Sequence, residues 1–562
     1  MTNRSQSQHL FDAAVSAHRA GRLADAQTGY RKVLEINSAH ADAMHLLGVV
    51  ELQEGRSAEG ERFILAALRH RRDAVFLTDL GSVLTIQGKK TQAEVAFREA
   101  LGLNPDFAEA HNRLGILLAQ TQRFSEAQAS FRRVAQLRPD SGEAYSNLGQ
   151  VLSETGRLLE AEAAFRRALQ LNPDHAEGHN NLGIVLSKTG RYAEAETAYR
   201  NALGLKPCYA EAHNNLGSLL YAMGRFNEAE IGLVRALVLN PSYVHASFNL
   251  GMLLLATGRY AEAWPHYESR CRLNMVDRRF RAPDFSYPRW QGESLIGKSI
   301  VLVPEQGFGD YIQFVRYVPM LKRRGATRIS VVCDPVLMPV LMTVEGVDQL
   351  VTDEDPLPPH DFWSFPLSLP RHFGTTVDTI PRSLPYVRAL QSRLEYWRTK
   401  LPVKGLKVGL AWKGRQTHGN DSNRSLHDIS ALEPLLSLPE VTFVSLQHEQ
   451  GDETPHSHAA QRLYALEGEI RDFGDVAAIA AQLDLVICVD TAIAHLVGAL
   501  DKPCWVLIPA FGCDWRWMKG RTDSPWYPAS VRLFRQEKAG DWSKTIQELT
   551  AALIAWTSAS RG

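Results

Sequence analysis

The sequence predicts a chain of two parts: an α superhelix of repeated helical hairpins over residues 8–272, followed by an α/β fold of two Rossmann-like halves over residues 298–562. The first part is indicated by an internal repeat with a period of 33 or 34 residues, which is typical of stacked helical units. The second part is indicated by short apolar runs, rich in β-branched residues, that alternate with segments of helical periodicity. A linker over residues 273–297 is rich in arginine, proline and aromatic residues, and we expect it to be a packed connector.

Two sequence features mark each repeat. A glycine turn, replaced once by glutamine, recurs at Gly21, Gly55, Gly88, Gln122, Gly156, Gly190, Gly224 and Gly258. A Leu-Gly pair recurs at Leu47-Gly48, Leu80-Gly81, Leu114-Gly115, Leu148-Gly149, Leu182-Gly183, Leu216-Gly217 and Leu250-Gly251. Small residues at these places allow paired helices to cross closely. The pattern resembles the tetratricopeptide repeat, which implies about eight units and a long concave face.

One position of the repeat carries asparagine in four consecutive units. The residue before the Leu-Gly pair is Asn147, Asn181, Asn215 and Asn249. An asparagine amide both donates to and accepts from a peptide backbone, so a row of them suits the binding of an extended polypeptide. The row resembles the asparagine ladder of the protein O-GlcNAc transferases. The alternative is a polar concave surface in which asparagine is only a consensus residue.

The earlier units depart from this pattern. Leu46, Asp79 and Arg113 occupy the same position. We expect those units to serve docking instead, or to form a homodimer through the repeats.

The α/β part divides into an N-terminal half, residues 298–400, and a C-terminal half, residues 401–562. Strands are expected at 299–303, 329–333, 406–412, 441–446 and 485–490, with helices at 311–323 and about 543–556. Two such halves imply a cleft, with ligands bound at the carboxyl ends of the strands.

The most informative stretch is residues 485–509, which reads as a strand, a helix and a second strand. The first strand ends at Asp490, and the small residues Thr491 and Ala492 permit a tight turn. The helix N-terminus beside Asp490 offers free N–H groups and the positive end of a dipole, which suit a diphosphate. The alternative is a plain strand–helix–strand unit, in which Asp490 caps the helix and His495 is a packed histidine.

Two further strand-end loops are expected to face the cleft. In the first, Gly307 and Gly309 allow a close backbone approach, and Asp310 opens a helix; the alternative is that Asp310 is only an N-cap. The second loop follows a buried strand directly and is a plausible diphosphate clamp, although a solvated surface loop would look similar. The residues of this loop that are candidates for binding the ligand are Trp412, Lys413, Gly414, Arg424 and Ser425. Gln447, after the next strand, is a further candidate.

Together these loops resemble the lipopolysaccharide heptosyltransferases, which have the GT-B fold. That family carries Gly-Asp at the first turn, matched by Gly309-Asp310, and Asp-Thr-Gly-x-x-His, matched by Asp490-Thr-Ala-x-x-His495 with alanine in place of glycine. The family also has a later loop that contains arginine and proline, and residues 521–528 of this sequence are similar to it. The resemblance implies that Asp310 is the general base, that Asp490, Thr491, Ala492 and His495 contact the donor, and that Lys413 and Arg424 stabilise the leaving diphosphate. It also implies that residues 298–400 bind the acceptor and residues 401–562 the nucleotide sugar, with no metal and no cofactor beyond that substrate.

The combination of repeats with such a domain resembles protein O-glycosyltransferases, including bacterial enzymes that glycosylate flagellins. We therefore expect a glycosyltransferase that moves a sugar, with inversion, to a hydroxyl of a protein acceptor such as flagellin. One alternative is a repeat scaffold with a degenerate, non-catalytic transferase domain. Another is a transferase of lipopolysaccharide or other glycan assembly.

Composition narrows the functional classes. The 62 basic and 62 acidic residues cancel, which argues against a nucleic-acid partner. The six cysteines form no CxxC pair, as expected of reduced residues in the cytoplasm. No stretch of the sequence resembles a signal peptide or a membrane span.

Other motifs rank lower. The acidic segment 353–355 reads as a solvated loop rather than a metal site, and the histidines at 448, 456 and 458 are too sparse for zinc. Trp515 and Trp517 are expected either to stack on a nucleotide base or to pack the domain.

Overall fold

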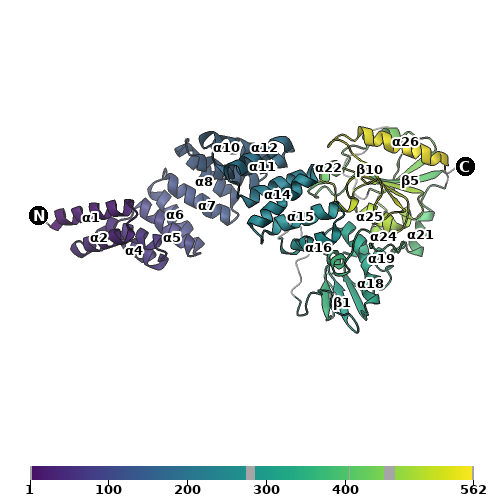
Figure 1. Cartoon of the computed structure of the whole chain (residues 1–562), viewed down its shortest axis with the longest axis horizontal. Helices are drawn as coiled ribbons and strands as arrows, with labels where there is room; N and C mark the ends of the chain where they lie inside the picture. The colour runs from purple at the N-terminus through teal and green to yellow at the C-terminus, as the bar shows by residue number, and fades with distance from the viewer. Residues whose placement is uncertain are drawn as a thin grey trace. The chain divides into compact units, whose positions relative to one another are not determined.

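The computed structural model describes residues 3–273, 285–352, 354–403, 405–447, 463–466 and 468–559. These residues form two compact units, Met1–Ala212 and His213–Gly562. Figure 1 shows helices alone in the first unit and both helices and sheets in the second. Unit 2 therefore contains the last repeat helices together with the whole α/β part.

Unit 1 consists of helical hairpins, in which each odd-numbered helix packs against the next. Its helices are α1 Asn3–Arg19, α2 Leu23–Ile36, α3 Ala41–Gln53, α4 Ser57–His70, α5 Ala74–Ile86, α6 Lys90–Leu103, α7 Ala108–Gln120, α8 Phe124–Leu137, α9 Gly142–Glu154, α10 Leu158–Leu171, α11 Ala176–Lys188 and α12 Tyr192–Leu205. The predicted hairpin repeat is confirmed.

The regular spacing of glycine in the repeats has two physical causes. The turn glycines adopt the left-handed conformation, with φ of 75° at Gly156 and 78° at Gly190, which costs glycine little. The glycine of the Leu-Gly pair lies close to the partner helix, and at Gly81, Gly115, Gly149 and Gly183 it lies under an aromatic ring: a Cβ at Gly183 would lie 2.6 Å from the ring of Tyr199. The prediction that small residues sit where helices cross is therefore confirmed.

The last repeat helices are α13 Ala210–Ala222, which spans the division between the units, α14 Phe226–Leu239, α15 Val244–Ala256 and α16 Tyr260–Tyr267. A short 3-10 helix, η1 Glu268–Arg272, ends this part of the chain.

The α/β part contains two parallel sheets. The first has the order β3-β2-β1-β4, from β1 Ser299–Leu302, β2 Arg328–Val332, β3 Gln349–Val351 and β4 Phe362–Ser364. The second has the order β10-β9-β8-β5-β6-β7, from β5 Leu406–Ala411, β6 Val441–Ser445, β7 Leu463–Tyr464, β8 Leu485–Val489, β9 Cys504–Ile508 and β10 Val531–Arg535. In both sheets the first strand along the chain is central, and the order reverses beside it. Such a switch point is where doubly wound sheets bind ligands.

The remaining elements connect the strands. They are α17 Phe308–Phe314, η2 Val315–Tyr317, α18 Val318–Arg323, η3 Pro335–Leu337, α19 Met338–Leu341, η4 Pro366–Ser368, α20 Leu369–His372, α21 Gln391–Arg398, α22 Asp421–Arg424, η5 Ile429–Leu432, α23 Glu433–Leu436, α24 Phe473–Ala480, α25 Ala492–Ala499, η7 Trp515–Trp517 and α26 Ser543–Ala559. The single helix expected at 311–323 is wrong. It is interrupted before Pro319, which lacks the N–H that a continuous helix would use.

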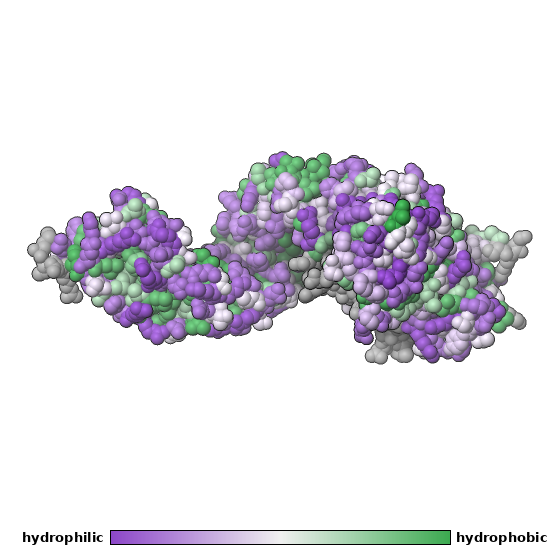
Figure 2. Space-filling view, turned by 90° about the horizontal axis from the view of Figure 1, so that it is seen from below, coloured by the Kyte–Doolittle hydropathy of each residue, from purple (hydrophilic) through white to green (hydrophobic). Residues whose placement is uncertain are grey.

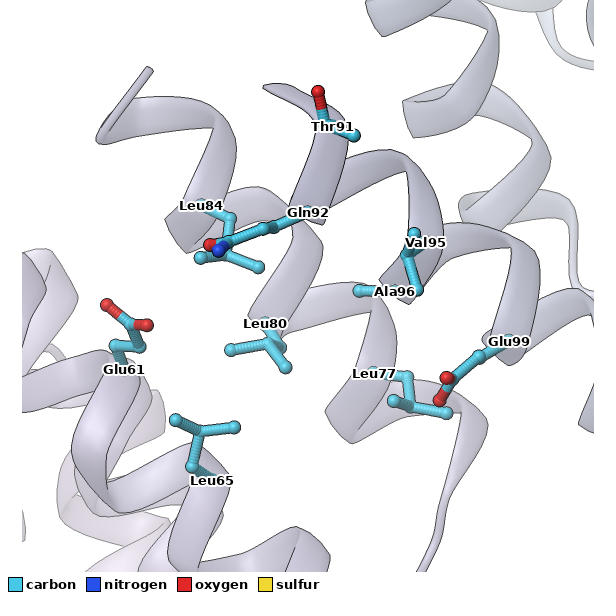
Figure 3. A pocket seen from close by; sticks show the side chains of 10 residues that line it. All are labelled: Glu61, Leu65, Leu77, Leu80, Leu84, Thr91, Gln92, Val95, Ala96 and Glu99. Carbon is cyan, nitrogen blue, oxygen red and sulfur yellow. The ribbon is translucent and has the colours of Figure 1, made fainter. Parts of the chain in front are cut away.

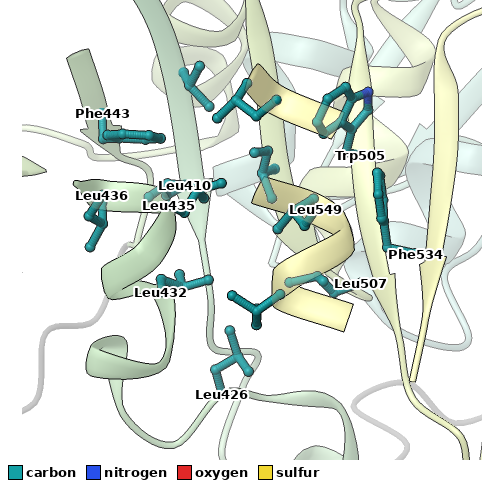
Figure 4. Packing of buried hydrophobic residues seen from close by; sticks show 14 of the residues in the cluster. Leu410, Leu426, Leu432, Leu435, Leu436, Phe443, Trp505, Leu507, Phe534 and Leu549 are labelled. Atoms are coloured by element: carbon teal, nitrogen blue, oxygen red, sulfur yellow. The ribbon is translucent and has the colours of Figure 1, made fainter. Parts of the chain in front are cut away.

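The main core of the second sheet lies between its strands and helices α23 and α26. Leu410, Phe443 and Leu507 of the strands pack with Leu435 of α23 and Leu549 of α26, and all five are buried (Figure 4). Burial of each such side chain contributes about 1.5–3 kcal/mol. This core anchors the carboxyl ends of β5 and β8.

The last repeat is part of the α/β structure, not a separate domain beside it. Tyr260, Trp264 and Tyr267 surround the ring of Trp515, with ring centroids 5.9–6.0 Å apart. The Trp264 Nε1 donates to the Thr375 carbonyl at 2.7 Å.

A buried ion pair adds to this connection. Arg270 of η1 is fully buried and donates to both carboxylate oxygens of Glu305, each at 2.9 Å. Glu305 follows β1, so the repeat is tied to the loop that leads into α17.

The described part of the linker, residues 285–297, is packed as predicted. Phe285 and Tyr287 stack at 4.7 Å and contact the core that contains Trp363, while Trp290 is fully buried.

None of the helices in the described ranges could span a membrane. A bilayer span needs about 20 consecutive apolar residues, and no described helix has that length and apolar character. The face seen in Figure 2 is mainly hydrophilic, with apolar residues in small groups.

The packing of the last repeat predicts where the chain can be divided. A fragment of residues 298–562 lacks Tyr260, Trp264 and Arg270, so it exposes Trp515 and leaves Glu305 without its cation. We expect its thermal unfolding at least roughly 10 °C below that of a fragment of residues 207–562, because several kcal/mol of contacts are lost. Differential scanning calorimetry of both fragments measures this. Equal melting temperatures would show that the last repeat is dispensable.

Candidate functional site

The structure brings the first and third predicted loops into contact. Gly309 of α17 packs against α25: a Cβ there would lie 2.8 Å from Cδ2 of His495 and 3.1 Å from Cα of Ala492. Only glycine fits without displacing these atoms. The small Ala492 serves the same close approach, so helices from the two sheets meet at their N-terminal ends.

Asp310 lies at this meeting point. It is the third residue of α17, and its Oδ2 accepts the Gly307 N–H at 3.0 Å; the N-cap itself is Gly307. Its Oδ1 accepts a hydrogen bond from Nη2 of Arg516. The side chain is 20% exposed. Burial raises the pKa of Asp310, and the positive charge of Arg516 opposes that shift.

Arg516 was missed by the sequence reasoning, although its neighbours Trp515 and Trp517 were considered. Its side chain is 4% exposed. It donates to Gln313 of α17 at 2.6 Å and to both carboxylate oxygens of Asp514 at 2.9 and 3.0 Å. The only signal in the sequence was its place after the strand 504–508.

The second predicted loop reaches Asp490 through Arg424. The Arg424 Nη1 donates to the Asp490 carbonyl at 2.9 Å. Ser425 is buried and holds the loop: its hydroxyl accepts the Gly414 N–H at 2.8 Å and donates to Asp421 at 2.7 Å. A Cβ at Gly414 would lie 2.6 Å from Arg424 Nη2, so a side chain at this position would displace the guanidinium.

Two of the candidate residues, Gln447 and Trp412, contact the backbone of this loop or the core below it. The Gln447 amide accepts the Lys413 N–H at 3.1 Å and donates to the Lys413 carbonyl at 3.2 Å. The Trp412 ring packs against the main core of the second sheet. Gln447 and Trp412 therefore position the loop backbone.

Asp490 and Thr491 stand at the N-terminus of α25. Thr491 is the N-cap residue but makes no side-chain capping bond, and its buried hydroxyl has no partner among the described residues. Burial raises the pKa of Asp490 to about 7, with a further increase from Asp514 and an opposing effect of Arg424. The helix terminus therefore has free N–H groups beside a carboxyl that is only partly ionised at neutral pH.

His495 has the packed position that was the alternative for this residue. Its side chain is buried and stacks on Trp517 with ring centroids 5.2 Å apart, and its Nδ1 lies 3.3 Å from the Tyr527 hydroxyl. Burial lowers its pKa to about 3, so the ring is neutral at pH 7. Its direct contact with a donor, predicted from the motif, is not favoured by this position.

Trp515 and Trp517 also pack the domain. Both are buried, at 1% and 0% exposure, so neither presents a free face to a nucleotide base.

The four asparagines of the repeats occupy equivalent places on α9, α11, α13 and α15 and are partly exposed. In unit 1, Asn147 donates to Asn112 of the preceding repeat at 3.2 Å. In unit 2, Asn249 donates to Asn214 in the same way at 3.0 Å. Each such bond uses one of the two amide N–H groups and leaves further capacity for a ligand.

One surface pocket lies away from these loops. It has a volume of about 320 Å³ and lies in unit 1 between α4, α5 and α6, where Leu65, Leu77, Leu80 and Leu84 line it (Figure 3). It contains none of the predicted site residues.

The acidic segment 353–355 and the three histidines were the other motifs considered in the sequence. Asp355 accepts the Thr352 N–H at 2.7 Å, as in a loop. Position 353 and the histidines at 448, 456 and 458 lie outside the described residues.

Comparison with known proteins identifies the repeats. Tetratricopeptide-repeat models match residues 74–107, 106–174, 140–207, 180–238 and 214–270. Residues 74–270 are tetratricopeptide repeats. They form a scaffold of the kind that binds peptides and proteins.

Similarity to individual proteins is more distant. Protein FlbA of Caulobacter vibrioides is 29% identical over 319 residues, which are 52% of this chain and 52% of that protein. The chain thus spans about half the length of this curated relative.

Among the solved structures that resemble part of the chain is YrrB, described as a TPR protein with an unusual peptide-binding site (22% identity, TM-score 0.29, covering 33% of this chain and 95% of that chain). Another is a tetratricopeptide repeat protein from Parabacteroides merdae (17% identity, TM-score 0.36, covering 44% of this chain and 99% of that chain).

The raised pKa of Asp490 predicts a specific pH dependence. Folding binds a proton at this carboxyl, so its contribution to stability falls as the pH rises from about 4, its unfolded value, to about 7. We expect Asp490→Asn to melt above the parent at pH 7.5 and close to it at pH 4. Thermal unfolding across this range measures the difference.

The exposed Asp378→Asn variant controls for the loss of one negative charge. A difference between Asp490→Asn and the parent that is constant with pH would contradict the raised pKa.

Proposed function

We propose that this chain is a glycosyltransferase that moves a sugar from a nucleotide-sugar donor to a hydroxyl of a protein bound by the repeats. The observation that carries the proposal is the contact of Gly309 with Ala492 and His495. Through it, the Asp310 loop after β1 and the Asp490 loop after β8 converge at the switch points of two parallel sheets, where ligands of such folds bind. This convergence supports the inference that the two Rossmann-like halves form a GT-B arrangement.

The donor would bind to the second sheet. The uncapped N-terminus of α25 offers N–H groups and a positive dipole end to the diphosphate. Arg424 lies 2.9 Å from the Asp490 carbonyl, and its guanidinium can hold two phosphate oxygens at once. Together with Lys413 it would stabilise the charge on the leaving nucleoside diphosphate, without a metal ion.

Asp310 would be the general base. It takes the proton of the acceptor hydroxyl while that oxygen bonds to the sugar C1 and the bond from C1 to the diphosphate oxygen breaks. A direct displacement of this kind inverts the configuration at C1. The two hydrogen bonds to Asp310, from Gly307 and Arg516, orient the carboxylate and leave lone pairs for the hydroxyl.

The repeats would bind the acceptor. Asn181 and Asn215, with Asn147 and Asn249, recur at one position of the repeat, and their amides suit a peptide backbone whatever its side chains. A flagellin is one such acceptor.

A second candidate is a repeat scaffold with a non-catalytic α/β domain. It is favoured by one observation: both oxygens of Asp310 already have partners, as in a purely structural carboxylate.

Nucleotide binding distinguishes the two candidates. We expect full-length protein to bind one nucleoside diphosphate of a panel, and Arg424→Ala to weaken it at least about tenfold, because a charge-assisted bidentate contact is lost. Isothermal titration calorimetry measures the dissociation constants. Arg532→Ala, an exposed arginine of β10, is the matched control.

An unchanged affinity in Arg424→Ala would remove this loop from the site. No binding of any nucleoside diphosphate would favour the scaffold.

Asp310→Asn separates catalysis from stability. Asparagine can still accept the Gly307 N–H but cannot take a proton at neutral pH. We expect normal donor affinity and release of the nucleoside diphosphate from the bound nucleotide sugar at least ~100-fold slower. Stopped assays of diphosphate release measure the rate, and a rate near that of the parent would exclude Asp310 as the base.

A further inference from the structure

The buried guanidinium of Arg516 joins the two sheets at the candidate site. Asp310 and Gln313 come from α17, which follows β1 of the first sheet. Asp514 precedes η7, which follows β9 of the second sheet. Arg516 contacts all three, with Nε on Gln313 at 2.6 Å, Nη1 on Asp514 at 2.9 Å and Nη2 on Asp310. One cation therefore connects the proposed base to the opposite half of the fold.

The position of Arg516 is determined from several sides. Its guanidinium carbon lies 4.5 Å from the ring centroid of Trp515 and 5.4 Å from that of Phe314. Asp514 also accepts the backbone N–H of Arg516 at 2.8 Å. Because Trp515 is surrounded by the aromatic residues of the last repeat, the guanidinium has little freedom to move away from Asp310.

We propose that Arg516 is the positioning residue of the proposed base, and this inference rests on the proposed function. Its positive charge favours the ionised form of Asp310 and so opposes the effect of burial on this carboxyl. Its geometry also fixes the direction of one carboxylate oxygen, so that the other lone pairs face the acceptor. Arg516 does not itself touch the reacting atoms in this scheme.

The groups that act most strongly on the charges of Asp310 and Arg516 come from several parts of the chain. Asp310 is influenced by Arg516, Asp514 and His418, and Arg516 by Asp514, Asp310 and Tyr267. Without Arg516, the remaining neighbours include the negative charge of Asp514, which disfavours ionisation of Asp310. Removing the cation therefore moves the ionisation of Asp310 to higher pH.

The first test needs no activity. Thermal unfolding of full-length Arg516→Gln, Arg516→Lys and the double variant Arg516→Gln/Asp310→Asn is followed from pH 4 to 8. We expect the stability of Arg516→Gln to fall more steeply with rising pH than that of the parent, because a carboxyl with a raised folded pKa loses stability above its unfolded pKa. We expect the stability of Arg516→Lys to fall with an intermediate slope. Adding Asp310→Asn to Arg516→Gln should make the dependence of stability on pH flatter. If the double variant has the same profile as Arg516→Gln, Arg516 does not control Asp310, and the proposal is overturned.

The second test follows the reaction. Water replaces the acceptor: it loses its proton to Asp310 and bonds to the sugar C1, while the nucleoside diphosphate leaves. The probe is the nucleotide sugar whose diphosphate the parent binds. In Arg516→Gln we expect the acid limb of the rate profile to move up by about one pH unit or more, a smaller shift in Arg516→Lys, and donor affinity within about threefold of the parent. Arg532→Gln serves as the matched control.

The outcomes separate the two proposals. An unchanged acid limb in Arg516→Gln, or a loss of rate that follows entirely from lost donor affinity, would overturn the positioning role. If the parent binds and hydrolyses no nucleotide sugar, the proposed function fails, and the unfolding experiment alone decides whether Arg516 governs the ionisation of Asp310.

Discussion

The close approach of α17 and α25 is the constraint on which the candidate site depends. Their contact requires Gly309 in one helix and a small residue, Ala492, in the other. Each helix is the first one after an interior strand of its own sheet, β1 for α17 and β8 for α25. Their meeting places Asp310 at the junction between the two sheets, within hydrogen-bond distance of Arg516 from the second half. A larger side chain at either position would separate the two sheets.

Buried arginines hold this junction together. Arg270 connects the last repeat to Glu305, Arg516 connects α17 to the segment after β9, and Arg316 donates to the Trp526 carbonyl at 2.9 Å. A buried cation is tolerated only where its hydrogen bonds are satisfied, and removing one partner typically costs about 3–5 kcal/mol. These contacts join segments far apart in the chain, so the last repeat, the first sheet and the second sheet form one structural unit.

Much of the fold could be predicted because its signals are local. The period of the repeats reflects a contact that recurs within each hairpin, such as Gly183 under the ring of Tyr199. The strands of the α/β part were found from short apolar runs, and Asp490 was placed correctly at the end of one. The helix expected at 311–323 failed because the effect of Pro319 on it was not considered. The role of His495 was read from a motif, whereas its burial depends on Trp517 and Tyr527 in a later segment.

The sequence by itself determined the tetratricopeptide repeats, the alternation of strands and helices, and the three loops that carry polar residues, since each follows from residues close together in the chain. Only the tertiary structure decided that Arg516 meets Asp310, 206 residues away, and that Trp526 donates to Tyr260 across 266 residues. Neither the amino-acid composition nor the period of the repeats specifies such pairs. They depend on how two sheets and a helical hairpin pack, and a buried charge finds its partner only once that packing has excluded water.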